Sequence, residues 1–164
     1  MADEVQFKKG MALLAGGVTL ITTGSGAMRR GITATAVCSL SAKPPSLIAC
    51  ANKDTGTAQA IKENNIFVVN VLGDNHKDIA MVFAGATGIA GVGRFEHGNW
   101  ADHSMGVPYL EDALVSFVCE TGVCVPYGSH FAFIGEVKDV IMKGDEALPV
   151  AWLGSSFHSL SPVA

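Results

Sequence analysis

Charge is scarce in this sequence, and positive charge especially so. Charged residues make up 16% of the 164 positions, and the formal net charge at pH 7 is −4. No basic stripe is available to neutralise a phosphate backbone, so nucleic acid is not an expected partner. No apolar run reaches the roughly 18 residues that a membrane helix requires. The charged stretch at residues 1–10 does not open a signal peptide, and a cytoplasmic location is expected.

Cysteine motifs are also missing. The four cysteines (Cys38, Cys50, Cys119 and Cys124) form no Cys-x-x-Cys pair. No histidine lies at metal-ligand spacing from them, so neither a metal site nor a disulfide framework is expected. Three of the four lie in apolar, strand-like runs, where a free cysteine behaves as a small hydrophobic residue. This usage predicts reduced thiols.

Two glycine patterns fall short of a dinucleotide-binding fingerprint. Gly24-Ser25-Gly26 lacks a third glycine, and a strand rather than a helix is expected after it. Gly91-x-Gly93 also lacks the third glycine, because Glu96 stands in its place. We therefore reject a Rossmann fold. A Ser/His/Asp arrangement or a pair of carboxylates is not evident either.

Apolar residues, in contrast, are abundant. They make up 49% of the chain, and 19 residues are glycine. The length predicts one domain over residues 1–164 that can bury a real core. This apolar fraction is high for a small monomer, so a dimer is expected to cover part of the surface.

The most informative stretch spans residues 29–57. It contains two β-like runs, Gly31–Val37 and Ser46–Ala51, joined by a short loop that ends in Pro44-Pro45. Both runs end in small or hydroxyl residues, so a flat polar ring could lie against the exposed strand backbone. The Lys53–Thr57 turn adds a cation, two hydroxyls and free amides at a helix start, which suits a phosphate. One interpretation is a site for a planar heterocycle with a phosphate tail, and the other is a core hairpin followed by a capped helix.

The remaining pattern is mainly β with short helices. Periodicity predicts helices over residues 4–15, 57–64 and about 74–85, and strands over residues 18–23, 29–37, 66–72, 114–125 and 130–142. Residues 85–106 are expected to be irregular. Many short strands with glycine-rich turns favour a closed barrel, which removes sheet edges.

Several motifs resemble those of the short-chain flavin reductases, the NAD(P)H:flavin oxidoreductases of two-component monooxygenases. The similar segments are Gly31-Ile32-Thr33-Ala34, Ser39-Leu40-Ser41, Pro44-Pro45 and Gly128-Ser129-His130 through Gly135-Glu136-Val137. The resemblance covers about residues 7–160 and implies a flavin-binding split β-barrel of Greek-key type that forms a homodimer. It also implies that NADH reduces FAD or FMN for a separate oxygenase, with reductases for (chloro)phenol hydroxylation as the most similar group.

The resemblance assigns roles to individual residues. His130 is the implied catalytic residue, an orienting or proton-relaying group that faces flavin and nicotinamide. The implied flavin-binding residues are Thr33, Ala34, Thr35, Ala36, Ser39, Ala51, Asn52, Lys53, Thr55, Thr57, Phe83, Ala84, Gly85, Arg94 and Phe157. Within that set, Lys53, Thr55 and Thr57 fall to the phosphate. Spacing alone favours a solvated loop arginine at Arg94.

The chain departs from the family pattern at several of these positions. Ser129 replaces the usual Asp before His130, Thr35-Ala36 replaces a frequent Asn-Ser, and Phe157 replaces a tyrosine. Hydride transfer between cofactors needs no strong acid or base from the protein, which agrees with the missing triad. Two alternatives remain open: a carrier that holds its flavin permanently, and a flavin-dependent reductase of corrin cobalt. The choices between FAD and FMN and between NADH and NADPH also remain open.

Overall fold

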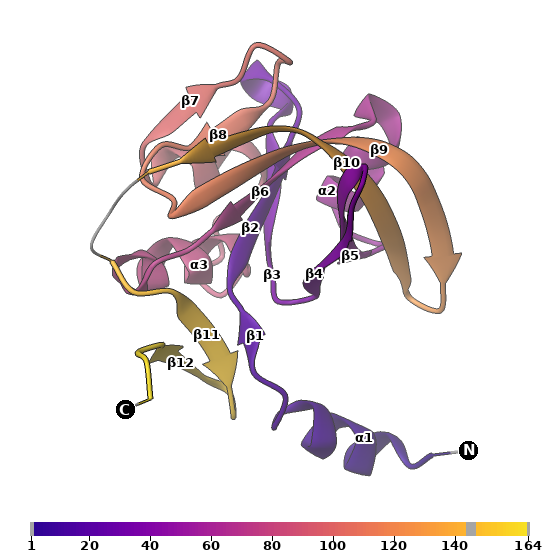
Figure 1. Ribbon diagram of the computed structural model, residues 1–164, viewed down its shortest axis with the longest axis vertical. Helices are drawn as coiled ribbons and strands as arrows, with labels where there is room; N and C mark the ends of the chain where they lie inside the picture. The colour runs from indigo at the N-terminus through magenta and orange to yellow at the C-terminus, as the bar shows by residue number, and fades with distance from the viewer. Residues whose placement is uncertain (1, 144–146, 164) are drawn as a thin grey trace.

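The computed structural model describes residues 2–143 and 147–163, and these form a mainly β fold with short helices, as predicted (Figure 1). The helices are α1 (Glu4–Met11), α2 (Gly56–Asn64) and α3 (Lys77–Phe83), with 3₁₀ turns η1 (Gly26–Met28), η2 (Asp74–His76) and η3 (Gly91–Glu96). The strands are β1 (Gly16–Gly17), β2 (Thr19–Thr23), β3 (Arg30–Ala34), β4 (Val37–Ala42), β5 (Pro45–Asn52), β6 (Ile66–Val71), β7 (Trp100–Asp102), β8 (Pro108–Leu110), β9 (Val115–Tyr127), β10 (His130–Met142), β11 (Val150–Leu153) and β12 (Ser156–Ser159).

Seven strands form one curved antiparallel sheet in the order β3-β2-β6-β9-β10-β5-β4. The sheet does not close, contrary to the closed barrel that the strand pattern favoured, because no pairing joins its edge strands β3 and β4 within the described residues. These strands are consecutive in the chain, but β3 pairs with β2 and β4 pairs with β5. The open arrangement is the split barrel that the family resemblance implied.

Strand β4 corrects one part of the sequence interpretation. Residues 38–42 were expected to belong to a loop between two runs, but together with Val37 they form a strand that pairs with β5. The short connection after β4 contains the cis Lys43-Pro44 peptide. The two runs therefore do not form a hairpin with each other. They approach only at the β3–β4 corner, where the backbone N–H of Cys50 donates to the carbonyl of Ala36 at 2.9 Å.

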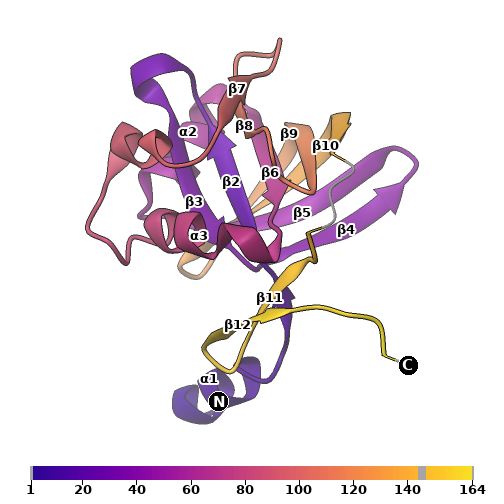
Figure 2. The same ribbon diagram turned by 90° about the vertical axis from the view of Figure 1, so that its left-hand side faces the viewer.

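The main core lies on the concave side of the sheet. Its largest members include Phe67 and Phe133, whose ring centroids are 6.3 Å apart, and Ile61 of α2 packs into the same cluster. A second core, on the side of α3, contains Leu20, Leu72 and Phe83. Helices α2 and α3 therefore flank the β2–β3 end of the sheet, as Figure 2 shows.

The N-terminal helix was predicted over residues 4–15 but ends at Met11, and none of its residues is buried. Gly16 and Gly17 form β1, which pairs with β11 in a separate three-stranded sheet completed by β12. Figures 1 and 2 show α1 standing away from the large sheet. In residues 2–143 and 147–163, no helix has both the length and the apolar character needed to cross a membrane.

Candidate functional site

Three adjoining cavities form a groove along β3, between α2, α3 and the C-terminal end of β5. The first, of about 330 Å³, lies at the start of α2, and the second, also of about 330 Å³, lies at the β3–β4 corner. They share lining from Ile32, Thr55, Phe83 and Ala84. The third, of about 200 Å³, continues from the corner to the β11–β12 hairpin. We call them the α2 cavity, the corner cavity and the hairpin cavity.

The α2 cavity has a polar end at the first turn of the helix. Thr55 is the N-cap residue, and its hydroxyl accepts from the backbone N–H of Ala58 at 3.2 Å. Thr57 lines the cavity and is only 4% exposed, yet its hydroxyl has no hydrogen-bond partner among the described residues. Solvent in the cavity reaches this hydroxyl, so a ligand bound there can form a hydrogen bond with it. The start of α2 therefore presents free donors and a positive helix end to the cavity.

Two arginines add positive charge to the α2 cavity. Arg94 is not a solvated loop residue: its guanidinium donates to the carbonyls of Ile89, Gly31 and Phe83 at 3.0, 3.0 and 3.2 Å. These bonds tie the loop after α3 to β3. The second cation, Arg30 at the start of β3, was not identified from the sequence.

Phe83 forms a wall of the groove and packs against Gly31 of β3. A Cβ on Gly31 would lie 2.5 Å from a Phe83 ring carbon, so only glycine allows this approach. Behind Phe83, the rings of Phe95 and Trp100 lie at centroid distances of 5.1 and 5.4 Å. This aromatic cluster fixes the wall.

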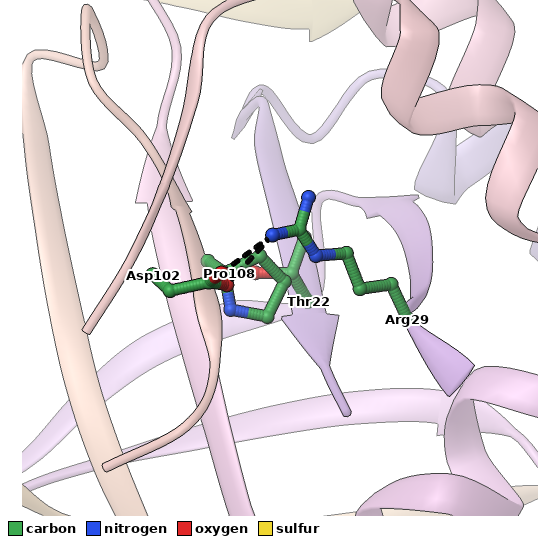
Figure 3. A network of polar contacts seen from close by, with 4 residues as sticks. All are labelled: Thr22, Arg29, Asp102 and Pro108. Atoms are coloured by element: carbon green, nitrogen blue, oxygen red, sulfur yellow. Dashed lines mark hydrogen bonds and ion pairs between the residues drawn. The ribbon is translucent and has the colours of Figure 1, made fainter. Parts of the chain in front are cut away.

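A separate polar network holds the β2–β3 hairpin on the β7–β8 hairpin (Figure 3). Arg29 donates to both carboxylate oxygens of Asp102 at 2.8 and 2.7 Å. The hydroxyl of Thr22 donates to the carbonyl of Pro108 at 2.6 Å. The Arg29 guanidinium also lies 5.8 Å from the centroid of the Phe95 ring. Both bonds come from the single nitrogen Nη2, and this ion pair anchors the residue that precedes β3, and thus one side of the α2 cavity.

The corner cavity has a floor of small residues and strand backbone. It is lined by Thr33 to Ala36 from the β3–β4 corner and by Cys50 to Asn52 from β5. Burial, and then the nearby Cys38, raise the pKa of the Cys50 thiol above its usual value. The thiol that faces the groove is therefore neutral at physiological pH. A flat ring can lie on such a floor and reach backbone groups.

His130 lies at the rim of the corner cavity, at the start of β10. Its Nδ1 is 2.9 Å from the hydroxyl of Ser129, so a hydroxyl occupies the place of the family's carboxylate partner. The opposite side of the turn is held by Lys53, whose ammonium donates to the carbonyl of Gly128 at 2.8 Å. Lys53 thus fixes the turn that carries His130.

The structure brings together most of the residues predicted for the site. Those that line the α2 or corner cavity are Thr33, Ala34, Thr35, Ala36, Ala51, Asn52, Thr55, Thr57, Phe83, Ala84, Arg94 and His130. Phe157 lines the hairpin cavity together with Trp152, 4.8 Å away between centroids. Their roles in binding stay predictions.

Three predicted site residues lie elsewhere. Ser39 lines an apolar trough of about 410 Å³ on the inner side of the open sheet. Lys53 and Gly85 line none of the three cavities, and Gly85 lies near the Arg94 side chain. Besides Arg30, the sequence interpretation did not place Cys50 or Gly56 at the site, and it assigned Trp152 to the core rather than to the site. The adjacent Arg29-Arg30 pair before the Gly31 motif was the one available signal.

Within the described residues, no cluster of three or more His, Cys, Asp or Glu side chains could hold a metal ion.

Comparison with known proteins decides the family. A model described as "flavin reductase like domain" matches residues 11–161, which is most of the chain. The chain belongs to the flavin reductase family. It is thereby an oxidoreductase that acts on flavins, as the sequence motifs implied.

Individual relatives agree with this assignment. The chain is 38% identical over 138 residues to an FMN reductase (NADH) RutF of Acinetobacter baylyi, covering 84% of this chain and 72% of the relative. The Streptomyces globisporus NADH:FAD oxidoreductase SgcE6, solved with NAD and FAD fragments, has a TM-score of 0.88 at 28% identity, covering 99% of this chain and 95% of the other. The flavin reductase PheA2 has a TM-score of 0.86 at 28% identity, covering 98% and 100%.

Proposed function

We propose that residues 1–164 form a single NADH-dependent flavin reductase domain that uses FMN or FAD. One observation carries the proposal: in this member of the family, the groove joins the corner cavity, with its floor of small residues, to the α2 cavity, which has cations and hydrogen-bond donors. The Thr57 hydroxyl and two arginines at that end fit a phosphate group. The corner cavity, of about 330 Å³, fits a flat heterocycle against strand backbone.

The groove residues have distinct tasks in this proposal. When bound, flavin supplies the redox chemistry, accepting at N5 the hydride that nicotinamide C4 donates. The β3–β4 corner and Ala51-Asn52 hold the ring and ribityl chain, and the α2 cavity holds the phosphate. Phe83, fixed by its aromatic neighbours, limits how the ring can shift. Such positioning accounts for much of the rate of a reaction between two bound cofactors.

His130 has an orienting task at the open side of the corner cavity. Its ring orientation is set by the Ser129 hydroxyl at 2.9 Å. We assign His130 to contact with the nicotinamide side of the reaction, and not to obligatory base catalysis.

Reduced flavin is proposed to leave the site for a separate oxygenase. One structural neighbour, BorF, is the flavin reductase component of a bacterial two-component tryptophan halogenase, and the groove of this chain is open to solvent on its corner side. An oxygenase that hydroxylates (chloro)phenolic aromatics remains the proposed recipient. A cytoplasmic setting is proposed as well, supported by four cysteines that are all described and all free.

The experiment that tests the reductase is NADH oxidation by the purified protein, with and without added FMN, FAD or riboflavin. We expect turnover that rises with added flavin and saturates. A tightly held flavin that copurifies with the protein, without NADH oxidation, would instead support the carrier. Absence of turnover with every flavin and with both NADH and NADPH would refute the reductase. Adding cob(II)alamin as an acceptor tests the corrin alternative in the same assay.

We also propose a homodimer, in which the convex face of β5, β9 and β10 meets a second copy. Directly opposed residues of antiparallel strands share a face. One face therefore carries Val123, Val125 and Tyr127 of β9, Ala132 and Ile134 of β10, and Ile48 of β5. Tyr127 is 84% exposed, and an exposed apolar patch of this kind indicates an interaction surface. His130 and Asn52 lie on the same face, so a second copy would sit beside the groove.

The dimer proposal predicts the effect of one surface charge. Val125→Lys is expected to convert a dimer into a monomer, because it would bury an unpaired ammonium in an apolar contact. Molar mass in solution, measured by light scattering after gel filtration, is the readout. Val92→Lys is the matched control, since Val92 and Val125 are 46% and 45% exposed. A wild-type monomer, or a Val125→Lys dimer, would contradict the proposal.

A further inference from the structure

We propose that Arg30 makes the α2 cavity selective for a phosphate monoester dianion, so that the protein prefers FMN to riboflavin and to FAD. This inference rests on the proposed flavin reductase function. It assigns specificity to a residue that the sequence motifs did not single out.

Arg30 is held in place by one edge of its guanidinium. Nη1 donates to the carbonyls of Arg29 and Ala27 at 2.8 and 3.3 Å. Its Nε and Nη2 have no hydrogen-bond partner among the described residues, and the side chain lines the α2 cavity. A Cβ built on Gly56 would lie 3.8 Å from Nε and Cδ of Arg30. The guanidinium therefore lies beside the first residue of α2, and the missing side chain at Gly56 leaves its free edge accessible.

Arg94 has the same arrangement on the other side of the cavity. Its Nε and Nη1 are occupied by three backbone carbonyls, whereas Nη2 has no partner within the described part of the chain. Both guanidinium groups are thus ordered before a ligand arrives. Binding then costs little additional side-chain entropy, and each planar group can offer donors to one phosphate.

The Thr57 side chain is an independent observation that points to a ligand in the same cavity, because its hydroxyl is open to the cavity and not to the outer surface. It is 4% exposed and lacks a partner among the described residues, and it lies at the N-terminal turn of α2. Phosphate oxygens would satisfy this hydroxyl together with the free amides of that turn. Acidic side chains are absent from the lining of this cavity.

This arrangement of charge distinguishes the flavins chemically. The terminal monoester of FMN carries about −1.5 to −2 charges at neutral pH, because its second pKa is about 6. The two phosphates of FAD form a pyrophosphate in which each carries a single negative charge, and riboflavin has no phosphate. Two arginines and a helix N-terminus gain more from the dianion than from either alternative. Arg30 is the residue of this set whose role can be tested by substitution, because Arg94 also holds the loop after α3 against β3.

The experiment measures equilibrium binding of oxidised riboflavin, FMN and FAD by flavin fluorescence, in phosphate-free buffer, for wild type and three variants. For Arg30→Ala we expect FMN to bind about 10- to 30-fold more weakly, with riboflavin changed less than about twofold. Arg30→Lys should recover only part of the loss, because an ammonium keeps the charge but not the planar fork. Lys62→Ala removes a cation from the last turn of the same helix and should leave all three affinities unchanged.

A second measurement needs no flavin. Inorganic phosphate should raise the melting temperature of wild type and Lys62→Ala, and should raise that of Arg30→Ala clearly less. Equal weakening of FMN and riboflavin in Arg30→Ala, or an unchanged FMN affinity, would overturn the assignment of Arg30. Wild-type protein that binds no flavin at all, and oxidises no NADH, would instead refute the proposed function. The two failures are therefore distinguishable.

Discussion

Replacing Asn70 by Ala is expected to lower the free energy of unfolding by about 3–5 kcal/mol, the largest stability effect that we predict. Asn70 is fully buried in β6. Its Nδ2 donates to the carbonyl of Leu20 at 3.0 Å and to the hydroxyl of Thr22 at 3.2 Å. Its Oδ1 accepts from the backbone N–H of Leu110 at 2.8 Å and from the hydroxyl of Ser116 at 2.9 Å. One amide thus connects β2, β8 and β9.

The size of this effect follows from what the substitution leaves behind. Each buried group without a partner costs about 1–3 kcal/mol, and the missing side chain adds a cavity. The loss is a large fraction of the roughly 5–15 kcal/mol by which domains are stable. Urea unfolding followed by circular dichroism is the measurement. Asn64→Ala is the control, because Asn64 is exposed and makes only a 3.4 Å contact with the Thr23 hydroxyl. Similar unfolding midpoints for the two variants would contradict the prediction.

Ala36→Phe is expected to weaken flavin binding by on the order of 100-fold without changing stability. Ala36 is exposed at the β3–β4 corner and lines the floor of the corner cavity. Its carbonyl, which accepts from Cys50 at 2.9 Å, is not altered by a larger side chain. A phenyl group would occupy the space proposed for the flavin ring. Overpacking of a few kcal/mol corresponds to about 100-fold in affinity.

Flavin fluorescence titration and urea unfolding together test this prediction. Ala42→Phe is the matched control, since Ala42 is also exposed and ends β4, the strand that follows Ala36, at its far end from the corner. We expect the control to bind FMN like wild type. If Ala36→Phe binds flavin with wild-type affinity, the corner cavity does not hold the ring. A parallel loss in both variants would point to a general disturbance of β4.

Local sequence patterns determined much of this protein. The alternation and apolar runs placed β2, β6, β9 and β10, and Thr55 and Asn65 mark the ends of α2 as capping residues should. The Gly31 motif and the His130 motif indicated the family, and the family match confirms it. These features depend on spacing along the chain, which a sequence displays directly.

Only the tertiary structure decided which of these segments meet. In the sequence, Asn70 is one polar residue within an apolar run. Its role in joining strands follows only from the fold, which brings polar groups of three other strands within hydrogen-bond distance of its side chain. Lys53 and Ser39 lie close in sequence to the groove residues, but strand direction and pairing point them elsewhere. Arg30 and Arg94 are 64 positions apart and face one cavity because the loop after α3 folds back onto β3. Such contacts between distant segments follow from the global packing of the chain, and no local pattern encodes them.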